Sequence, residues 1–215
     1  MTVYRLTKKL VFPPPELADD DGLLAVGGDL SVERLVLAYS MGIFPWYSGN
    51  SPVLWWSPNP RLVLIPADLK VSHTLRQTIR KGIFRVTTNV AFEDVIRNCA
   101  TITRREGEGT WITDEMIKAY IKLHKAGYAH SVETWDGDEL AGGFYGIMMG
   151  RAFFGESMFA KKSDASKVAF ATYATQLAEK NFELIDCQVT TAHMKRFGAK
   201  EISRTEFMKH LENAL

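Results

Sequence analysis

The chain has 215 residues, of which 46% are hydrophobic and 24% are charged, and its formal net charge at pH 7 is +1. This composition is typical of a globular protein, and the charge excludes a polycation that binds nucleic acid over its whole surface. The two cysteines, Cys99 and Cys187, have neither metal-site nor redox spacing, and no apolar run approaches the roughly 20 residues of a membrane span. We therefore expect a cytoplasmic protein without a membrane segment, in which any nucleic-acid contact comes from a local basic patch.

The first part of the chain is irregular and aromatic. Residues 1–22 are polar and rich in proline, and a helix is predicted over residues 31–41, with Ser31 as its N-terminal cap. The preceding pair Gly27-Gly28 fits neither dinucleotide-binding nor P-loop spacing, so it predicts a turn. Residues 43–61 contain three of the five tryptophans with prolines between them, which predicts a rigid, aromatic-walled loop region.

Regular alternation begins after Arg61. Strands are predicted over residues 62–65 and 84–88, a basic helix over 72–80 between them, and helices over 92–100 and 113–127, with a charged glycine loop at 104–111. This change of character predicts a small N-terminal domain, residues 1–61, and a second domain, residues 62–215.

The second half of the chain is predicted to form a strand meander followed by helices and further strands. The predicted strands are residues 131–134, 139–149, 152–159, 184–189 and 200–204, and the predicted helices start at Ala165, Thr191 and Glu206. We predict a mixed α+β fold whose core is similar to that of N-acyltransferases. In that fold a glycine-rich loop cradles the coenzyme A pyrophosphate. The corresponding residues 160–164 contain no glycine, which disfavours coenzyme A as donor.

A polar interruption marks the strand at residues 152–159. Gly155, Glu156 and Ser157 break its apolar run, and a buried carboxylate costs stability unless it has a partner or a function. Two interpretations stay open. The segment lines an anion-facing pocket together with Lys161 and Lys162, or it is an ordinary strand with one ion-paired glutamate.

Asp186 and Gln188 are the second candidate for chemistry. If residues 184–189 form a strand, the two side chains share one face and Cys187 faces the other way. A hydrogen bond from the Gln188 amide to Asp186 would fix the amide and enrich its carbonyl oxygen in electron density, so that this oxygen can hold an attacking amine. The alternative is a hydrogen-bonded pair with no catalytic role.

Seven short motifs occur in an order that resembles one family, the bacterial leucyl/phenylalanyl-tRNA–protein transferases. The motifs are Gly27-Gly28-Asp29-Leu30, Gly42-Ile43-Phe44-Pro45-Trp46, Trp55-Trp56-Ser57-Pro58, Gly109-Thr110-Trp111-Ile112-Thr113, Gly155-Glu156-Ser157-Met158-Phe159, Ala165-Ser166-Lys167 and Asp186-Cys187-Gln188. The resemblance implies transfer of Leu, Phe and Met from aminoacyl-tRNA to proteins with N-terminal Arg or Lys, which marks them for degradation by the N-end rule. The aminoacyl ester is already activated, so we expect no metal or cofactor.

The resemblance also implies roles for individual residues. Asp186 and Gln188 would be the catalytic pair, and Tyr39 with Trp46 would hold the terminal adenosine. Glu156 would line the reacting centre, and its own charge makes it the natural partner of a cation, either the donor's ammonium or the acceptor's basic side chain. The donor side chain and the reacting centre would be surrounded by Trp46, Trp111, Phe144, Phe153, Gly155, Ser157, Met158 and Tyr173, the last in place of the phenylalanine expected there.

Contacts to tRNA are expected mainly through phosphates, with binding that weakens steeply as salt rises. The candidate cations are Arg76, Arg80, Lys81, Arg85, Lys118 and Lys122. We expect a monomer. Two other functions remain open: a coenzyme A-dependent N-acetyltransferase, and a non-catalytic tRNA-binding module that would not need Gln188.

Overall fold

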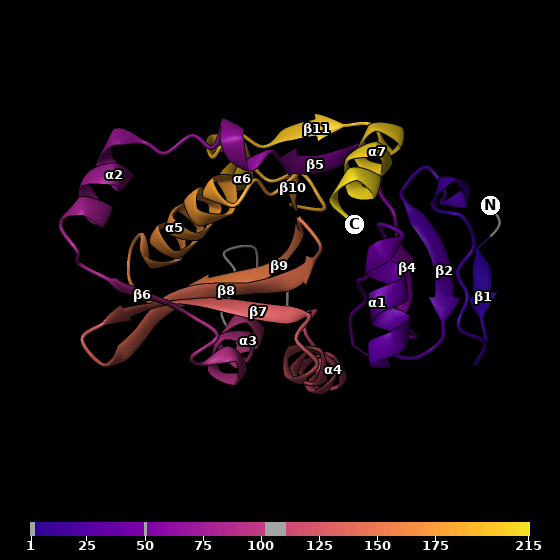
Figure 1. Cartoon of the computed structure of the whole chain (residues 1–215). Coiled ribbons are helices and arrows are strands. Elements are labelled where there is room, and N and C mark those ends of the chain that lie inside the picture. Colours follow the sequence, from indigo (N-terminus) through magenta and orange to yellow (C-terminus); the bar gives the residue numbers. More distant parts are fainter. Residues whose placement is uncertain (1–2, 50, 102–110) are drawn as a thin grey trace.

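The computed structural model describes residues 3–49, 51–101 and 111–215, and these form two sheets with helices around them (Figure 1). Of the glycine loop predicted over 104–111, residues 104–110 lie outside the described residues. The smaller sheet has four strands in the order β1-β2-β4-β3, which are Tyr4–Leu6, Leu23–Gly27, Leu54–Trp56 and Phe44–Pro45. Helix α1, Val32–Ser40, follows the predicted span, and the Ser31 side chain caps it.

The expectation of a loop over residues 43–61 was wrong in part, because this region contains β3 and β4. The proline in β3 is tolerated because β3 is an edge strand, where a missing N–H breaks no ladder. Trp55 of β4 is fully buried, and its indole N–H donates to the carbonyl of Gly27 at 2.8 Å. Gly27 and Gly28, with φ of 87° and 78°, turn the chain after β2 as expected.

The larger sheet has seven strands in the order β11-β5-β10-β9-β8-β7-β6. Their bounds are Lys200–Ile202, Arg61–Leu64, Leu184–Asp186, Ala152–Ala160, Glu139–Met149, Ala129–Asp136 and Arg85–Thr88. All neighbours are antiparallel except β9 and β10, which are parallel and joined by helix α5, Ala165–Glu179. This meander, helix and parallel strand confirm the predicted α+β fold with an N-acyltransferase-like core.

Helices cover both faces of the larger sheet (Figure 1). Helix α5 lies on one face, whereas α3, Phe92–Thr101, and α4, Asp114–Lys125, lie on the other. The remaining helices are α2, His73–Arg80, α6, Ala192–Arg196, and α7, Arg204–Ala214, with short turns η1, Pro15–Leu17, and η2, Pro66–Asp68. Within the described residues, none of the helices combines the length and the apolar content of a membrane span.

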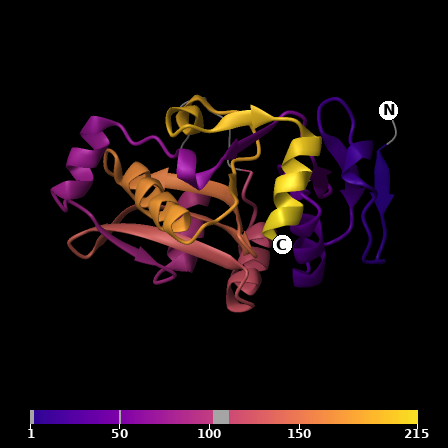
Figure 2. The ribbon, with the colours of Figure 1, turned by 45° about the horizontal axis from the view of Figure 1, so that its top comes forward.

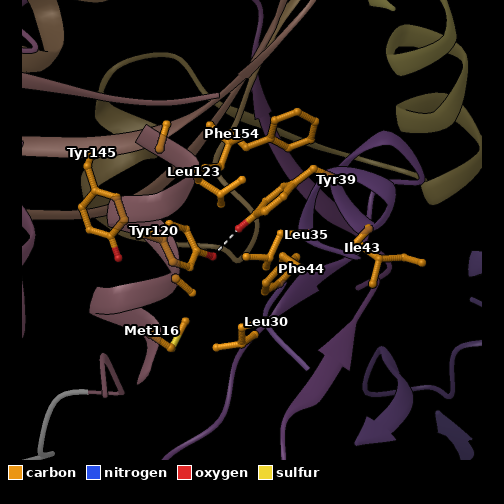
Figure 3. Close-up of a cluster of buried hydrophobic side chains, with 14 of the residues drawn as sticks. Leu30, Leu35, Tyr39, Ile43, Phe44, Met116, Tyr120, Leu123, Tyr145 and Phe154 are labelled. Atoms are coloured by element: carbon orange, nitrogen blue, oxygen red, sulfur yellow. Dashed lines mark hydrogen bonds between the residues drawn. The ribbon is translucent and has the colours of Figure 1, made fainter. Parts of the chain in front are cut away.

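One hydrophobic cluster connects the two sheets. It contains Tyr39 of α1, Tyr120 of α4 and Phe154 of β9, all at most 1% exposed. Figure 3 shows α1 side chains facing α4 across this cluster, and Figure 2 shows α7 standing between the two sheets. The change of sheet falls where the domain boundary was predicted, near Arg61. Because the cluster crosses it, two independently folding domains stay a prediction.

Candidate active site

A cavity of about 520 Å³ opens where β9 and β10 separate. The two strands pair only as far as Phe154 and Asp186. Beyond these residues β9 continues, while the chain after Asp186 turns away and leaves a space between them. Residues from both sheets line it: Phe44, Pro45, Trp46, Trp111, Phe144, Tyr145, Phe153, Gly155, Glu156, Ser157, Met158, Ser166, Phe170, Ile185, Asp186, Cys187, Gln188, Val189, Thr191, His193 and Met194.

Ten of the twelve residues expected to surround the substrates or to act in catalysis line this cavity, and two do not. Tyr173 lies behind the wall, with its ring 5.7 Å from that of Phe144 and 5.2 Å from that of Phe153, measured between centroids. Tyr39 is 1% exposed. Neither side chain lies in the cavity, so in this structure they support the residues that face it.

Asp186 is held by an arginine that the sequence analysis did not single out. The Nε and Nη2 groups of Arg61 donate to the two carboxylate oxygens of Asp186 at 2.9 and 2.6 Å, and both side chains are at most 1% exposed. The guanidinium lies 4.7 Å from the ring centroids of both Phe44 and Phe207. Such a paired, stacked arrangement fixes the orientation of the Asp186 carboxyl group.

The expected hydrogen bond between the side chains of Asp186 and Gln188 was wrong. The strand ends at Asp186, and Gln188 adopts a left-handed conformation with φ of 61°, so the two residues do not alternate along a strand. Asp186 accepts instead from the backbone N–H of Gln188 at 2.8 Å. The side-chain amide of Gln188 donates to Glu156 at 2.9 Å. Asp186 therefore positions the backbone of Gln188, and Glu156 orients its amide.

Glu156 is the most perturbed carboxyl group in the cavity wall. Its Oε1 accepts from Tyr39 at 2.7 Å and its Oε2 from Tyr120 at 3.1 Å. Removal from water raises the pKa of Glu156 from 4.5 to about 7, and the hydrogen bonds from Tyr39, Tyr120 and Gln188 limit this rise. The cavity thus contains one carboxyl group that is paired with an arginine, Asp186, and one that exchanges a proton near neutral pH, Glu156.

Comparison with known proteins identifies the family. Residues 63–212 match the family model described as leucyl/phenylalanyl-tRNA protein transferase, and residues 28–59 match the model of its N-terminal domain. A transferase of this name from Syntrophobacter fumaroxidans is 59% identical over 97% of this chain and 89% of its own length. One from an Anaeromyxobacter species is 59% identical over 100% of this chain and 92% of its own length.

The chain belongs to the leucyl/phenylalanyl-tRNA–protein transferase family. The predicted family and enzyme class, an aminoacyltransferase of the N-end rule, are confirmed. Among solved structures, a conserved protein of unknown function from Staphylococcus epidermidis has a TM-score of 0.43 at 11% identity, covering 84% of this chain and 68% of its own. L-PGS from Bacillus licheniformis has a TM-score of 0.40 at 10% identity, covering 79% and 54%.

The loop after β9 has no free amide groups for a pyrophosphate at its first two positions. In this transferase the backbone N–H groups of Lys161 and Lys162 both donate to the carbonyl of Ala141, at 2.8 and 3.2 Å. The Lys162 ammonium pairs with Asp136 at 2.6 Å. The loop therefore lacks the glycines by which an N-acyltransferase holds coenzyme A, and its first two amides are already bonded within the fold.

The six cations expected to contact tRNA are all exposed, and they fall into two groups. Arg76, Arg80, Lys81 and Arg85 lie on α2 and the segment that leads into β6, whereas Lys118 and Lys122 lie on α4. Figures 1 and 2 both place α2 and α4 at separate positions around the larger sheet. These residues therefore do not form one continuous patch, and the contact of either group with tRNA stays a prediction.

Several residues of this transferase site escaped the sequence analysis. Arg61 gave no signal, because its partner Asp186 is 125 positions away. Tyr120 lies on the apolar face of the helix expected over 113–127, a pattern that predicts burial but not a hydrogen bond to Glu156. Cys187 lines the cavity, but burial raises the pKa of its thiol, so it stays protonated and is not a nucleophile.

Proposed function

We propose that the chain transfers Leu, Phe or Met from aminoacyl-tRNA to the α-amine of proteins that begin with Arg or Lys. The observation that carries this proposal is the arrangement of Gln188 and Glu156 at the separation of β9 and β10. This arrangement lies beside an aromatic cavity, in a chain of this family. The products are a peptide bond and a free tRNA, and the aminoacyl ester supplies the driving force without a cofactor. We also propose that it acts in the cytoplasm, where aminoacyl-tRNA is found.

The aromatic side of the cavity suits the donor's side chain. Phe144 packs edge to face against Phe153 at 5.9 Å and against Phe170 at 5.8 Å between ring centroids, and Met158 completes the wall. These walls accept an aromatic group or an aliphatic group that is not branched at Cβ, and they oppose one that is branched at Cβ. A pocket of this kind discriminates by about 1–3 kcal/mol per misplaced methylene group.

The polar side of the cavity suits the attacking amine. Because Glu156 holds the amide nitrogen of Gln188, the carbonyl oxygen of Gln188 is left to accept a hydrogen bond from the amine. Asp186 acts one step further away, by fixing the Gln188 backbone in its left-handed conformation. Catalysis then rests on positioning two substrates in a partly dry site.

The test is transfer of labelled leucine from Leu-tRNA to a peptide that begins with Arg, compared with the same peptide beginning with Ala. We expect transfer to the Arg peptide alone, and its loss in Gln188→Ala with tRNA binding unchanged. Transfer that survives in Gln188→Ala would refute the role of this residue. Absence of transfer by the unmodified chain, with tRNA still bound, would favour a non-catalytic tRNA-binding module, and binding of acetyl-CoA would favour an acetyltransferase.

A further inference from the structure

Three oxygen-bearing side chains from three elements form a closed triangle at the back of the cavity. The hydroxyl oxygens of Tyr39 and Tyr120 are 2.5 Å apart, and each hydroxyl also contacts one oxygen of Glu156. Figure 3 shows the two tyrosines extending from α1 and α4 until their hydroxyl groups meet. Both tyrosines are at most 1% exposed, so their hydroxyl groups depend on these contacts, and not on bulk water, for hydrogen bonds.

The number of available hydrogens decides which contacts of this triangle are hydrogen bonds. Each of the three O···O contacts needs one hydrogen, but the two hydroxyl groups supply only two. When Glu156 is ionised, one contact therefore brings two oxygens together without a proton between them. When Glu156 gains a proton, all three contacts become hydrogen bonds and the ring closes. The triangle thus holds both forms of Glu156: both tyrosines donate to the ionised carboxylate, and all three contacts are hydrogen bonds in the protonated acid, so Glu156 can take up a proton without losing its partners.

The other carboxylate of the cavity is not available for this task. The two oxygens of Asp186 accept three hydrogen bonds, two from Arg61 and one from the backbone of Gln188. Both oxygens of Asp186 are thus already occupied by donors, and its buried partner Arg61 depends on this contact. Glu156 has no cationic partner among the described residues.

The charged and titratable groups around Glu156 also make it the group that takes up a proton. Tyr39 and Tyr120 have pKa values well above 10 because they are buried, so near neutral pH they act as donors. The negative charge of Asp186 on β10 opposes a second negative charge on Glu156, and Arg61 lies beyond Asp186 and is neutralised by it. Tyr145 of β8 contacts Tyr120 edge to face at 5.6 Å between centroids.

We propose that Glu156 is the proton acceptor of the transfer reaction, and that Tyr39 and Tyr120 are positioning residues that hold its carboxylate ready for the proton. This inference rests on the proposed function. The acceptor's α-ammonium gives one proton to the Glu156 carboxylate and becomes a neutral amine. The amine then forms the new C–N bond at the ester carbonyl. A second proton moves from the nitrogen to the ribose oxygen as the C–O bond breaks, and Glu156 releases its proton to solvent.

Comparison of two acceptors tests the proton transfer in Glu156→Gln. This substitution preserves the shape of the side chain, and its amide, like the protonated acid, accepts at one atom and donates at the other, but it cannot take up a proton. One acceptor is the Arg peptide, and the other is the same peptide with an N-terminal hydrazine group, whose weakly basic nitrogen is already neutral at pH 7. We expect kcat for the Arg peptide to fall by roughly 100-fold or more, within the range for general bases, and the loss for the hydrazine to be several-fold at most. Equal losses for both acceptors would overturn the proposal.

The tyrosines are tested through the pH dependence of the rate. Removing a hydroxyl that donates to the carboxylate raises the pKa of Glu156, so Tyr39→Phe and Tyr120→Phe should move the acidic limb of the kcat profile to higher pH. Tyr47→Phe is the matched control, because Tyr47 is also buried and loses a hydroxyl contact, to Thr113 at 3.4 Å. A lower rate in the two variants with no shift of this limb would mean that the tyrosines only support the fold.

The unmodified chain separates failure of this inference from failure of the proposed function. If it transfers leucine to neither acceptor, the proposed function itself is wrong. If it transfers leucine to both, while Glu156→Gln keeps the full rate with the Arg peptide, the reaction stands and the role of Glu156 is refuted.

Discussion

At the scale of single residues, the buried ion pair between Arg61 and Asp186 is the strongest determinant of the site's geometry. Both side chains are at most 1% exposed and they share two hydrogen bonds. Removing one partner leaves a buried charge without compensation, whereas an exposed pair of the same chemistry contributes little.

We therefore expect Arg61→Met to lower the free energy of unfolding by about 3–5 kcal/mol, measured by urea denaturation. Arg97→Met is the matched control, since Arg97 also contacts a carboxylate, Glu93, at 2.6 Å but is 55% exposed. Arg97→Met should lower the free energy of unfolding by no more than about 1 kcal/mol. Equal effects of the two substitutions would contradict the importance of burial.

Glu156 predicts a specific dependence of stability on pH. Its pKa is about 7 in the folded chain against 4.5 ordinarily, so between these values the folded state binds more protons than the unfolded state. The contribution to stability is thus fully present below pH 4.5 and is lost as the pH rises through 7, by at most about 3 kcal/mol. The unfolding free energy of the unmodified chain should fall relative to Glu156→Gln over this range. Parallel curves for the two proteins would exclude the perturbed carboxyl.

At the scale of elements, sequence patterns predicted the strands and helices in the second half of the chain well, but they failed at residues 184–189, which contain the candidate catalytic pair. The strand 139–149 and the start of α5 at Ala165 agree with the observed bounds, because hydrophobic alternation and turn residues specify them. The strand expected over 184–189 ends at Asp186 because Gln188 is left-handed, with its N–H bonded to Asp186, which Arg61 holds from 125 positions away, and its amide bonded to Glu156. Local patterns do not encode such contacts.

The pairing of β8 with β9 offers a test at this scale. Gly146 and Gly155 face each other across the two strands, next to an irregularity in the register. A Cβ on Gly146 would overlap the Phe154 carbonyl oxygen and lie 2.5 Å from the ring of Phe153, in the cavity wall, whereas one on Gly155 would meet the Asp186 carbonyl oxygen at 3.5 Å.

Gly146→Ala should therefore lower the melting temperature by several degrees, as expected for about 1–3 kcal/mol of overpacking. Gly155→Ala, measured in the same thermal unfolding assay, should change it much less. A similar loss in both would mean that glycine is needed for backbone freedom and not for space.

At the scale of the whole molecule, the net charge is only +1, but cations gather in two local groups, one on α2 and β6 and the other on α4. A phosphate-dominated mode predicts that the logarithm of the tRNA affinity falls linearly with the logarithm of salt concentration. Only residues that touch phosphates contribute to the slope.

We expect the double variant Arg76→Glu/Arg80→Glu to weaken tRNA binding and to reduce the salt slope by about 2, or by roughly 1 per lost phosphate contact. Lys118→Glu/Lys122→Glu tests the other group in the same titration. Lys180→Glu/Lys209→Glu, at two exposed lysines outside both groups, controls for the same change of net charge. Binding that is insensitive to salt in the unmodified chain would refute electrostatic recognition.

The placement of Tyr39 and Phe44 has a consequence for how such chains can be recombined. Both residues precede Arg61, yet one touches Glu156 and the other stacks on the guanidinium that orients Asp186. A chimera that joins the first 60 residues of one relative to the remainder of another would take Tyr39 and Phe44 from one parent and their partners Glu156 and Arg61 from the other. Recombination at this junction is therefore expected to yield folded but impaired proteins wherever the parents differ at these contacts.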